Sequence, residues 1–344
     1  MKKIALLAGD GIGKEVVPEG ARVLAKLAPA WSLTEVPYGA DHTLARGVAI
    51  TADEMRALGE FDGILLGALG DPRIANGQHA REILLGMRTQ LDLYVNFRPC
   101  FALADKLVPL KNRSAADVHF SVFRENTEGL YTGIGGSFKT GTADEIATEQ
   151  EINTRKGVER ILRAAFEFAQ QTPRHKLVMA DKANAMAHGH GLWRRTFAQL
   201  QLEFADVQAS ALYVDNLVFQ LVRDPTQFDV IVTNNLFGDI VTDLAAALQG
   251  GLGLAASANY RPGGPAMFEP VHGSAPDIAG KGIANPLGTI GCVALMLRHL
   301  GETAKAEQLD RALVRVVSES ELTPDLGGKA TTVQVTNAVL AALE

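Results

Sequence analysis

Three carboxylates in the second half of the chain have the spacing of a cation site. Asp239 and Asp243 lie four residues apart in a segment of helical period, so both side chains share one helix face. Like charges at this spacing repel each other by about 0.2–0.5 kcal/mol unless a cation lies between them. Asp215 directly follows a predicted strand, where open α/β sheets place ligands. Oxygen ligands without nearby His or Cys favour Mg²⁺ or Mn²⁺; the alternative is a helix N-cap at Asp215 and a solvated helix face at the pair.

Arginines at the ends of predicted elements are candidates for holding a carboxylated ligand. Residues 91–98 alternate strictly between apolar and polar and predict a strand that ends at Arg98, while Arg124 ends another predicted strand. A predicted helix carries one stripe at i, i+3, i+4 and i+7, made of Arg81, Leu84, Leu85 and Arg88. The planar guanidinium matches two carboxylate oxygens, whereas the alternative for each arginine is an ordinary surface position.

Short apolar runs alternate along the chain with longer segments of helical period. The runs predict strands at Lys3–Ala8, Gly63–Leu69, His119–Phe123, Lys176–Ala180, Ser210–Val214 and Asp229–Thr233. The periodic segments predict helices at Lys14–Leu27, His79–Arg88, Gly157–Gln170 and Leu236–Leu248. This alternation predicts an α/β protein with a largely parallel sheet. The glycine-rich stretch Gly250–Gly264 is where we expect the chain to cross between domains.

Length and composition narrow the class of protein. A chain of 344 residues that is 47% hydrophobic and 21% charged predicts two domains or one large one. The net charge of −6 argues against nucleic-acid binding, and no run of about 18 apolar residues predicts a membrane span. The apolar run after Met1 stops at Gly9, too early for a signal peptide. Cys100 and Cys292 are too few for a disulfide framework or a zinc cluster and suit a reducing, cytoplasmic setting.

The glycines after the first predicted strand do not form a dinucleotide fingerprint. Gly9, Gly11 and Gly13 are followed by Lys14, which occupies the place of the third glycine of G-x-G-x-x-G. They still indicate a tight turn that allows another group to approach the backbone closely.

Six segments in order resemble the β-decarboxylating dehydrogenases, the family of 3-isopropylmalate, isocitrate, homoisocitrate and tartrate or D-malate dehydrogenases. They are Gly9–Gly13, Arg88–Pro99, Arg124–Tyr131, Asp181–Asn184, Asn235–Asp243 and Glu269–Pro286, and the match runs nearly end to end. The resemblance implies a fold other than the Rossmann fold, with two α/β domains flanking a cleft. Residues 1–98 and 248–344 would form the cofactor-side domain with both termini, and residues 99–247 the central domain with the dimer interface and the metal and lysine residues.

The resemblance also implies roles at a site shared within a homodimer. Lys182 would be the catalytic base, which burial beside a dication would keep neutral, and Tyr131 would protonate C3. Lys182 and Asp215 would reach in from the second subunit, and Asp215 would join Asp239 and Asp243 on the metal. Substrate contacts would come from Arg88, Arg98, Arg124, Asp215, Leu84 and Leu85.

Cofactor contacts are implied mainly by the loop near the C-terminal end. The implied residues are Ile12, Asn184, Glu269, His272, Gly273, Ser274, Ala275, Asp277, Ile278 and Asn285. A carboxylate at Asp277 would accept a hydrogen bond from a ribose 2′-hydroxyl and repel a 2′-phosphate, which predicts NAD.

The implied reaction is the NAD- and divalent-metal-dependent oxidative decarboxylation of a 3-substituted malate. The apolar Leu84 and Leu85 favour 3-isopropylmalate, converted to 4-methyl-2-oxopentanoate in leucine biosynthesis. Arg81 and Ala185 depart from the isopropylmalate pattern, where an acid and a larger residue are expected. Homoisocitrate, isocitrate, D-malate and tartrate therefore stay open as substrates. Lys182, Tyr131 and the three aspartates argue against a non-catalytic regulatory homologue.

Overall fold

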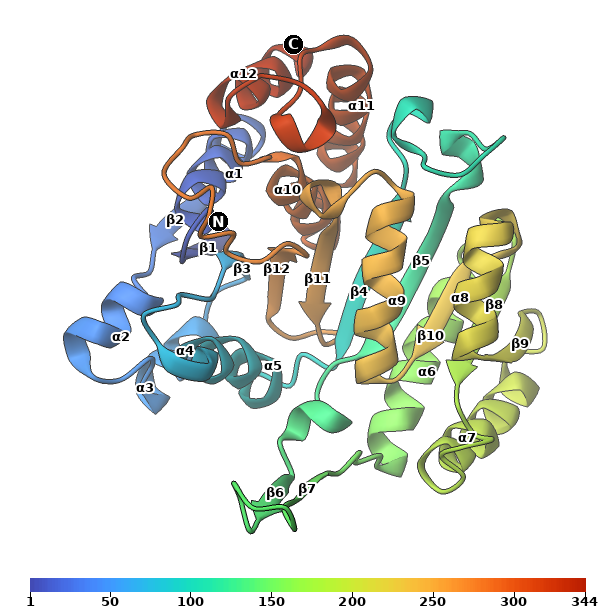
Figure 1. Ribbon diagram of the computed structural model, residues 1–344. Helices are drawn as coiled ribbons and strands as arrows, with labels where there is room; N and C mark the ends of the chain where they lie inside the picture. Colours follow the sequence, from blue (N-terminus) through green and yellow to red (C-terminus); the bar gives the residue numbers. More distant parts are fainter. The chain divides into compact units, whose positions relative to one another are not determined.

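The computed structural model describes all residues 1–344 and divides into two compact units. Unit 1 contains residues 1–93, 98–118 and 245–344, and therefore both chain ends; unit 2 contains residues 94–97 and 119–244 (Figure 1). Residues 99–118 and 245–247, which the resemblance assigned to the central domain, belong to unit 1, and residues 94–97, assigned to the cofactor-side domain, belong to unit 2. The stretch Gly250–Gly264 lies wholly in unit 1, so the crossing predicted there is wrong; the chain leaves unit 2 after Leu244.

Unit 1 is built on strands in the order β2-β1-β3-β12-β11. Their bounds are β1 Lys3–Gly9, β2 Ser32–Glu35, β3 Gly63–Ala68, β11 Ala256–Tyr260 and β12 Ala266–Pro270. The pairs are parallel except for β11 with β12, which is antiparallel, so the sheet of this unit is mixed. The sequence predicted a largely parallel α/β sheet, which is confirmed.

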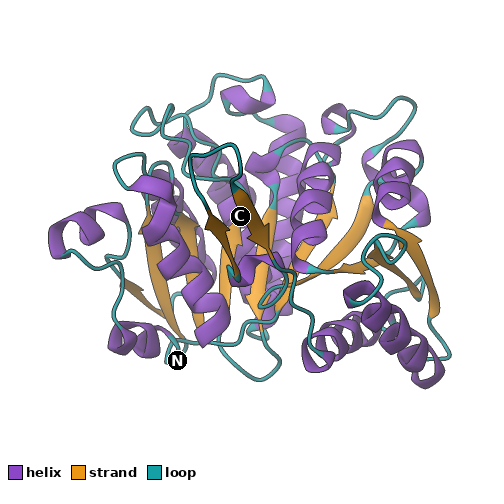
Figure 2. Ribbon diagram, turned by 60° about the horizontal axis from the view of Figure 1, so that its bottom comes forward, coloured by secondary structure: helices purple, strands orange, loops and turns teal.

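Helices cover both faces of the sheet in unit 1 (Figure 2). They are α1 Gly13–Leu27, α2 Ala40–Arg46, α3 Ala52–Leu58, α4 Gln78–Ala80, α5 Gly86–Gln90, α10 Leu287–His299, α11 Thr303–Glu319 and α12 Thr332–Ala342. On one face α1 and α10 contact the strands, with α11 and α12 packed behind them. On the other, Met55 and Met87 join Leu7 and Leu66 in one apolar cluster. Burial of both faces explains why β1 and β3 are almost continuously apolar.

Unit 2 contains the parallel strands β5-β10-β8-β9. The strands are β5 His119–Glu125, β8 Lys176–Asp181, β9 Gln208–Tyr213 and β10 Val230–Thr233. The helices are α6 Arg155–Ala169, α7 Gly189–Glu203, α8 Val214–Arg223 and α9 Asn235–Leu248, whose last four residues belong to unit 1. The strand β4, Val95–Phe101, begins in unit 2 and ends in unit 1. A separate antiparallel hairpin, β6 Gly135–Phe138 with β7 Ile146–Glu149, is exposed along its whole length. No helix of the protein is long and apolar enough to cross a bilayer.

Local sequence patterns account for these elements where periodicity is strong. The buried stripe of α6 consists of Val158, Ile161, Leu162, Ala165, Phe166 and Ala169, all of which the helical spacing predicts to face inward. Thr154 caps this helix by accepting a hydrogen bond from the backbone of Gly157. The strand predicted from residue 91 begins later, at Val95, because Asp92 has a φ of 53° that interrupts the extended chain.

The helix between α4 and α5 contains a π-helical turn, η2, Arg81–Leu85. A π-turn adds a residue to the helical repeat and so rotates the side chains on its two sides relative to each other. Arg88 is buried, whereas Arg81 is exposed. The prediction that Arg81 and Arg88 share one stripe of a regular helix is therefore wrong.

Candidate active site

Arg124 is the centre of a polar cluster in unit 2. Its guanidinium is 1% exposed; Nε and Nη2 donate to Oδ1 of Asn235 at 3.1 and 2.8 Å, and Nη1 donates to Oδ1 of Asp239 at 2.5 Å. The register of β10 with β5 pairs Thr233 with Arg124, which brings the start of α9 beside the arginine. A Cβ at Gly238 would lie 2.4 Å from the Arg124 side chain, so this position has room only for glycine.

Tyr131 completes this cluster. Its hydroxyl donates to Oδ2 of Asp239 at 2.9 Å, and its ring lies 5.2 Å from the guanidinium carbon of Arg124. Burial and the negative charge of Asp239 raise the pKa of the Tyr131 phenol above its ordinary value. The phenol is therefore a proton-bearing donor at neutral pH. Asp243 lies one turn further along α9 with its side chain exposed.

Lys182 and Asp215 form an ion pair elsewhere in unit 2, with 2.5 Å between Nζ and Oδ1. The register of β8 with β9 pairs Asp181 with Tyr213, which brings Lys182, the residue after β8, close to the first turn of α8, where Asp215 lies. The hydrogen bond from Lys182 holds the pKa of the Asp215 carboxyl below its ordinary value. In the single chain the Lys182 side chain is 29% exposed and that of Asp215 65%. Burial of Lys182 beside a dication at a shared site stays a prediction.

The structure excludes the alternative that Asp215 is the N-cap of a helix. The N-cap of α8 is Tyr213, and Asp215 lies within the first helical turn. Within one chain, no three side chains of the His, Cys, Asp and Glu types are gathered where they could hold a metal. A site with Asp215, Asp239 and Asp243 stays a prediction that requires a second subunit.

Arg88 in unit 1 is a buried cation with an unused donor. Its Nη2 donates to Oε1 of Glu269 at 2.8 Å, and Asn259 donates to the same oxygen at 2.9 Å. The arginine is 5% exposed, and its Nε is buried without a hydrogen-bond partner. An unpaired buried donor costs about 1–3 kcal/mol, which a bound anion would recover. Leu84 and Leu85 lie half-buried one turn before Arg88.

Two more predicted residues take part in the structure of unit 1. Arg98 is buried on β4. Glu269, predicted as a cofactor contact, accepts hydrogen bonds from Arg88 and Asn259 through one carboxylate oxygen.

The loop that joins β12 to α10 closes on the start of α1. The backbone N–H of Ile12 donates to the carbonyl of Ser274 at 2.9 Å. Gly11 has a φ of 51°, and a Cβ there would lie 2.0 Å from that carbonyl oxygen, so the close approach indicated by the glycine spacing is confirmed. Glu15 accepts from the backbone N–H groups of Gly280 and Gly282 at 2.6 and 2.8 Å. Ile12 itself is buried, in a cluster with Val16, Ala275, Ile278, Ala279 and Ala284.

The remaining residues predicted to contact the cofactor differ in solvent exposure and in hydrogen bonding. Gly273 and Asp277 are exposed on this loop. Burial lowers the pKa of His272, so its ring is neutral at pH 7; Nδ1 lies 3.0 Å from the Gly273 carbonyl, and Nε2 is buried without a partner. Asn285 donates to Asp325 at 3.0 Å and accepts from the backbone of Leu287 at 3.0 Å. Asn184 is exposed after β8, in unit 2 rather than in unit 1 with the others.

Sequence analysis did not single out Asp10, whose carboxylate accepts hydrogen bonds from three separate segments of unit 1. It is buried, and its carboxylate accepts from Ala40 N at 2.7 Å, from Gly70 N at 2.8 Å and from Nε2 of His79 at 2.7 Å. An Asp between two glycines at the end of a buried strand was the available signal. The partner at residue 79 could not be predicted, because 69 residues separate the two.

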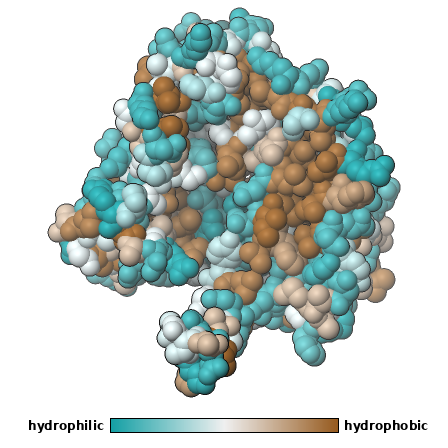
Figure 3. All heavy atoms as spheres, in the orientation of Figure 1, coloured by the Kyte–Doolittle hydropathy of each residue, from teal (hydrophilic) through white to brown (hydrophobic).

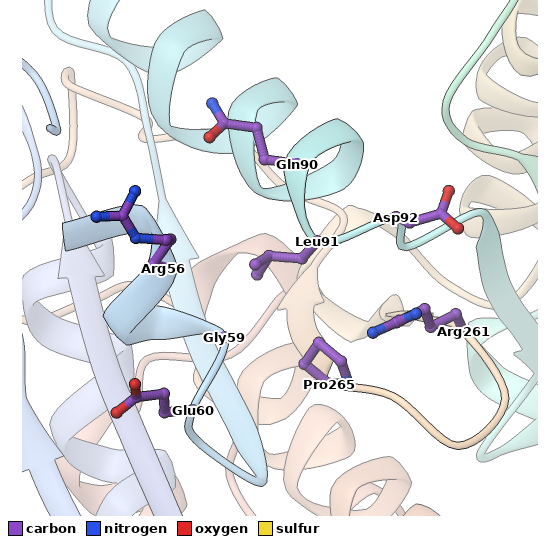
Figure 4. A pocket seen from close by; sticks show the side chains of 8 residues that line it. All are labelled: Arg56, Gly59, Glu60, Gln90, Leu91, Asp92, Arg261 and Pro265. Atoms are coloured by element: carbon purple, nitrogen blue, oxygen red, sulfur yellow. The ribbon is translucent and has the colours of Figure 1, made fainter. Parts of the chain in front are cut away.

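A pocket of about 400 Å³ in unit 1 contains none of the predicted site residues. Its lining is Arg56, Gly59, Glu60, Gln90, Leu91, Asp92, Arg261 and Pro265 (Figure 4). Leu91 points across it toward Gly59. Acids and bases are mixed in this lining, so it does not select one class of ligand.

Comparisons with known proteins agree on one family. A family model described as isocitrate/isopropylmalate dehydrogenase matches residues 3–339. The 3-isopropylmalate dehydrogenase of Rhodococcus erythropolis is 46% identical over 99% of this chain and 100% of its own, and that of Corynebacterium efficiens is 47% identical over 92% and 93%.

Solved structures give the same picture of the fold. An isocitrate dehydrogenase from Methylococcus capsulatus superposes with a TM-score of 0.91 at 35% identity, covering 100% of this chain and 99% of that one. The TT0538 protein from Thermus thermophilus superposes with a TM-score of 0.89 at 35% identity, covering 99% of this chain and 68% of that one. The prediction of this α/β fold is confirmed.

Proposed function

The chain belongs to the isocitrate/isopropylmalate dehydrogenase family, and from this premise we propose that it is an NAD-dependent 3-isopropylmalate dehydrogenase. It would oxidise the C2 hydroxyl to a ketone and release the carboxylate on C3 as CO₂, giving 4-methyl-2-oxopentanoate. The observation that carries the substrate is Arg88, a buried cation with an unused Nε donor one turn from the half-buried Leu84 and Leu85. An anion-binding group beside an apolar wall suits a malate with an alkyl substituent.

The residues on α9 fit a hard divalent cation. Asp239 and Asp243 lie on successive turns, both carboxylates are reachable from solvent, and oxygen is the ligand that Mg²⁺ and Mn²⁺ prefer. Asp215 of the partner subunit would be the third ligand. When bound, such a cation supplies positive charge that polarises the C2 oxygen and stabilises the enolate left by the loss of CO₂.

The loop after β12 fits a nucleotide cofactor whose nicotinamide accepts the hydride. The close approach at Gly11 fixes the loop to the start of α1, and the neutral His272 retains an unpartnered Nε2. Asp277 lies exposed on the same loop, where its charge would oppose a 2′-phosphate. These features support NAD.

Different side chains would bind the substrate and transfer its protons. Arg88, Arg98 and Arg124 would bind carboxylates of the substrate. Lys182 would take the proton of the C2 hydroxyl on Nζ, after its ion pair with Asp215 is given up and Nζ has released its extra proton to water. Tyr131, whose raised pKa keeps the phenol protonated, would deliver a proton to C3 after CO₂ has left.

A homodimer with shared sites is part of the proposal. Phe219 and Val222 follow Asp215 on α8 at i+4 and i+7, so an exposed apolar face carries the carboxylate. Ile240 is exposed beside Asp239 and Asp243 on α9. Figure 3 shows hydrophobic atoms gathered over the part of unit 2 where Figure 1 labels α9 and α8. Burying this face against a second copy would also remove water from Lys182.

Steady-state kinetics with five substrates tests the assignment. The panel contains 3-isopropylmalate, homoisocitrate, isocitrate, D-malate and tartrate, each with NAD and Mn²⁺. We expect kcat/KM for 3-isopropylmalate to exceed every other value by at least ~10-fold, which is about 1.4 kcal/mol. A higher value for another malate would reassign the substrate, and no turnover with any of them would favour a regulatory homologue.

A further inference from the structure

The backbone of Lys182 is held by a buried histidine that the proposed mechanism does not use. The Lys182 N–H donates to Nδ1 of His190 at 2.8 Å, and His190 is 1% exposed at the start of α7. Because Nδ1 accepts this bond, the ring proton must reside on Nε2. The histidine therefore presents an acceptor to the Lys182 loop and a donor to the opposite side.

A carboxylate fixes that tautomer from the other side of the ring. Nε2 of His190 lies 3.3 Å from Oε1 of Glu151, and Asn234 donates a short hydrogen bond to the same oxygen. Burial opposes ionisation of Glu151, but the hydrogen bonds from His190 and Asn234 outweigh it and leave the pKa of the carboxyl below its ordinary value. Glu151 is thus a charged acceptor that keeps the proton of His190 on Nε2.

The same network reaches the helix that carries Asp239. Asn234 accepts from the backbone N–H of Phe237 through Oδ1 at 2.9 Å, which caps the first turn of α9. The ring of Phe237 meets the His190 ring edge-on, with 5.4 Å between centroids. One buried imidazole therefore contacts both the loop that bears Lys182 and the first turn of α9.

We propose that His190 is a positioning residue that sets the backbone of Lys182 relative to α9. The inference rests on the proposed role of Lys182 as the base. His190 acts through the Lys182 amide, and Glu151 acts through His190 by holding its tautomer. Loss of the Nδ1 acceptor would free the Lys182 loop while leaving the arginines proposed to bind the substrate in place, so kcat should fall with little change in KM for the malate.

Two substitutions separate the two sides of the ring. His190→Asn places an amide oxygen near the position of Nδ1 and keeps the acceptor for Lys182, whereas His190→Gln places an amide nitrogen near Nε2 and keeps only the donor to Glu151. We expect kcat of the Gln variant to fall at least ~10-fold and that of the Asn variant to stay within ~3-fold of wild type, with both KM values nearly unchanged. Hydrogen exchange of the Lys182 amide should accelerate only in the Gln variant.

The measurements distinguish failure of this inference from failure of the proposed function. Equal loss of kcat in both variants, or unchanged protection of the Lys182 amide in the Gln variant, would overturn the positioning role and leave a histidine that only fills the core. If the wild-type chain turns over none of the five malates, the proposed function fails. Amide exchange measured on the full chain without substrate still decides whether His190 holds Lys182.

Discussion

Asp239 joins Arg124 and Tyr131 in the polar cluster of unit 2. Its two carboxylate oxygens accept from a buried guanidinium and from a phenol, yet the side chain is still 38% exposed. A carboxylate in this setting is held in one orientation while an edge of it stays open to a cation.

Asp239→Asn should abolish turnover and metal binding while the fold persists. The amide keeps an acceptor for Arg124 but loses the charge that a divalent cation requires, so we expect kcat to fall by at least ~100-fold. Calorimetric titration with Mn²⁺ and a thermal melt would check binding and fold. Asp310→Asn, at an exposed ion pair on α11, is the matched control and should change neither. Full activity of the wild type in EDTA would contradict the prediction.

Asp277 should make NAD the preferred cofactor. It lies exposed on the loop after β12, and a fixed negative charge there opposes the 2′-phosphate of NADP. We expect kcat/KM with NAD to exceed that with NADP by at least ~10-fold, about 1.4 kcal/mol. Asp277→Asn should narrow the ratio by improving NADP. Equal use of both cofactors by the wild type would show that Asp277 does not face the ribose.

At the scale of elements, the sequence predicted what local periodicity determines. The stripe of α6 and the apolar strands β1 and β3 are set by neighbours in the chain, and the structure confirms them. The π-turn in η2 was not predictable, because its side chains fit a regular helix equally well. The start of β4 was predicted too early for a related reason. Apolar and polar residues alternate over residues 91–98, although the chain turns at Asp92, and a turn of the backbone does not change this alternation.

The π-turn changes the expectation for Arg81. Because Arg81 is exposed and lies on the far side of the turn from Arg88, it should not contact the alkyl substituent of the substrate. Arg81→Ala should leave the ranking of the five malates unchanged and alter kcat/KM for 3-isopropylmalate by less than ~3-fold, with any larger effect confined to KM for NAD. A selective loss of more than ~10-fold for an anionic-tailed malate would instead assign Arg81 to a homoisocitrate-like pocket.

The capping box of α3 should make part of the stability of unit 1 depend on pH. Thr51 accepts from the backbone of Glu54, and Glu54 accepts from the backbone of Thr51 and from Arg46. These bonds lower the pKa of Glu54 from 4.5 to about 2. Because the folded pKa is depressed, their contribution is complete above pH 4.5 and is lost as the pH falls toward 2.

Thr51→Ala should therefore destabilise the protein by about 1 kcal/mol at pH 7, with a smaller difference from wild type at pH 3. Urea denaturation at the two pH values measures both quantities. Thr51→Ser keeps the hydroxyl and should behave as the wild type at both. A difference for the Ala variant that grows on acidification would mean that Glu54 is not held by this cap.

For the whole molecule, the long-range ion pairs of the candidate site could not be predicted from the sequence. The ion pairs Arg124–Asp239 and Arg88–Glu269 join residues 115 and 181 positions apart, and only the packed units reveal them. The family resemblance named the metal and base residues, but the exposure of Lys182 and Asp215 is a property of the folded chain. This exposure is what the proposed site, completed by a second copy, requires.

Subunit complementation tests whether the sites are shared. In a dimer of Lys182→Met with Asp239→Asn, one site would combine the intact Asp239 of the first chain with the intact Lys182 of the second, while the other site would carry both defects. Random pairing gives mixed dimers in half of the molecules, each with one working site, so co-expression should restore about 25% of wild-type activity from two inactive chains. Co-expression of Asp239→Asn with Asp243→Asn is the control, because both changes lie on α9 and every site keeps a defect. Recovery absent from the first pair would mean that Lys182 and Asp239 of the same chain work together.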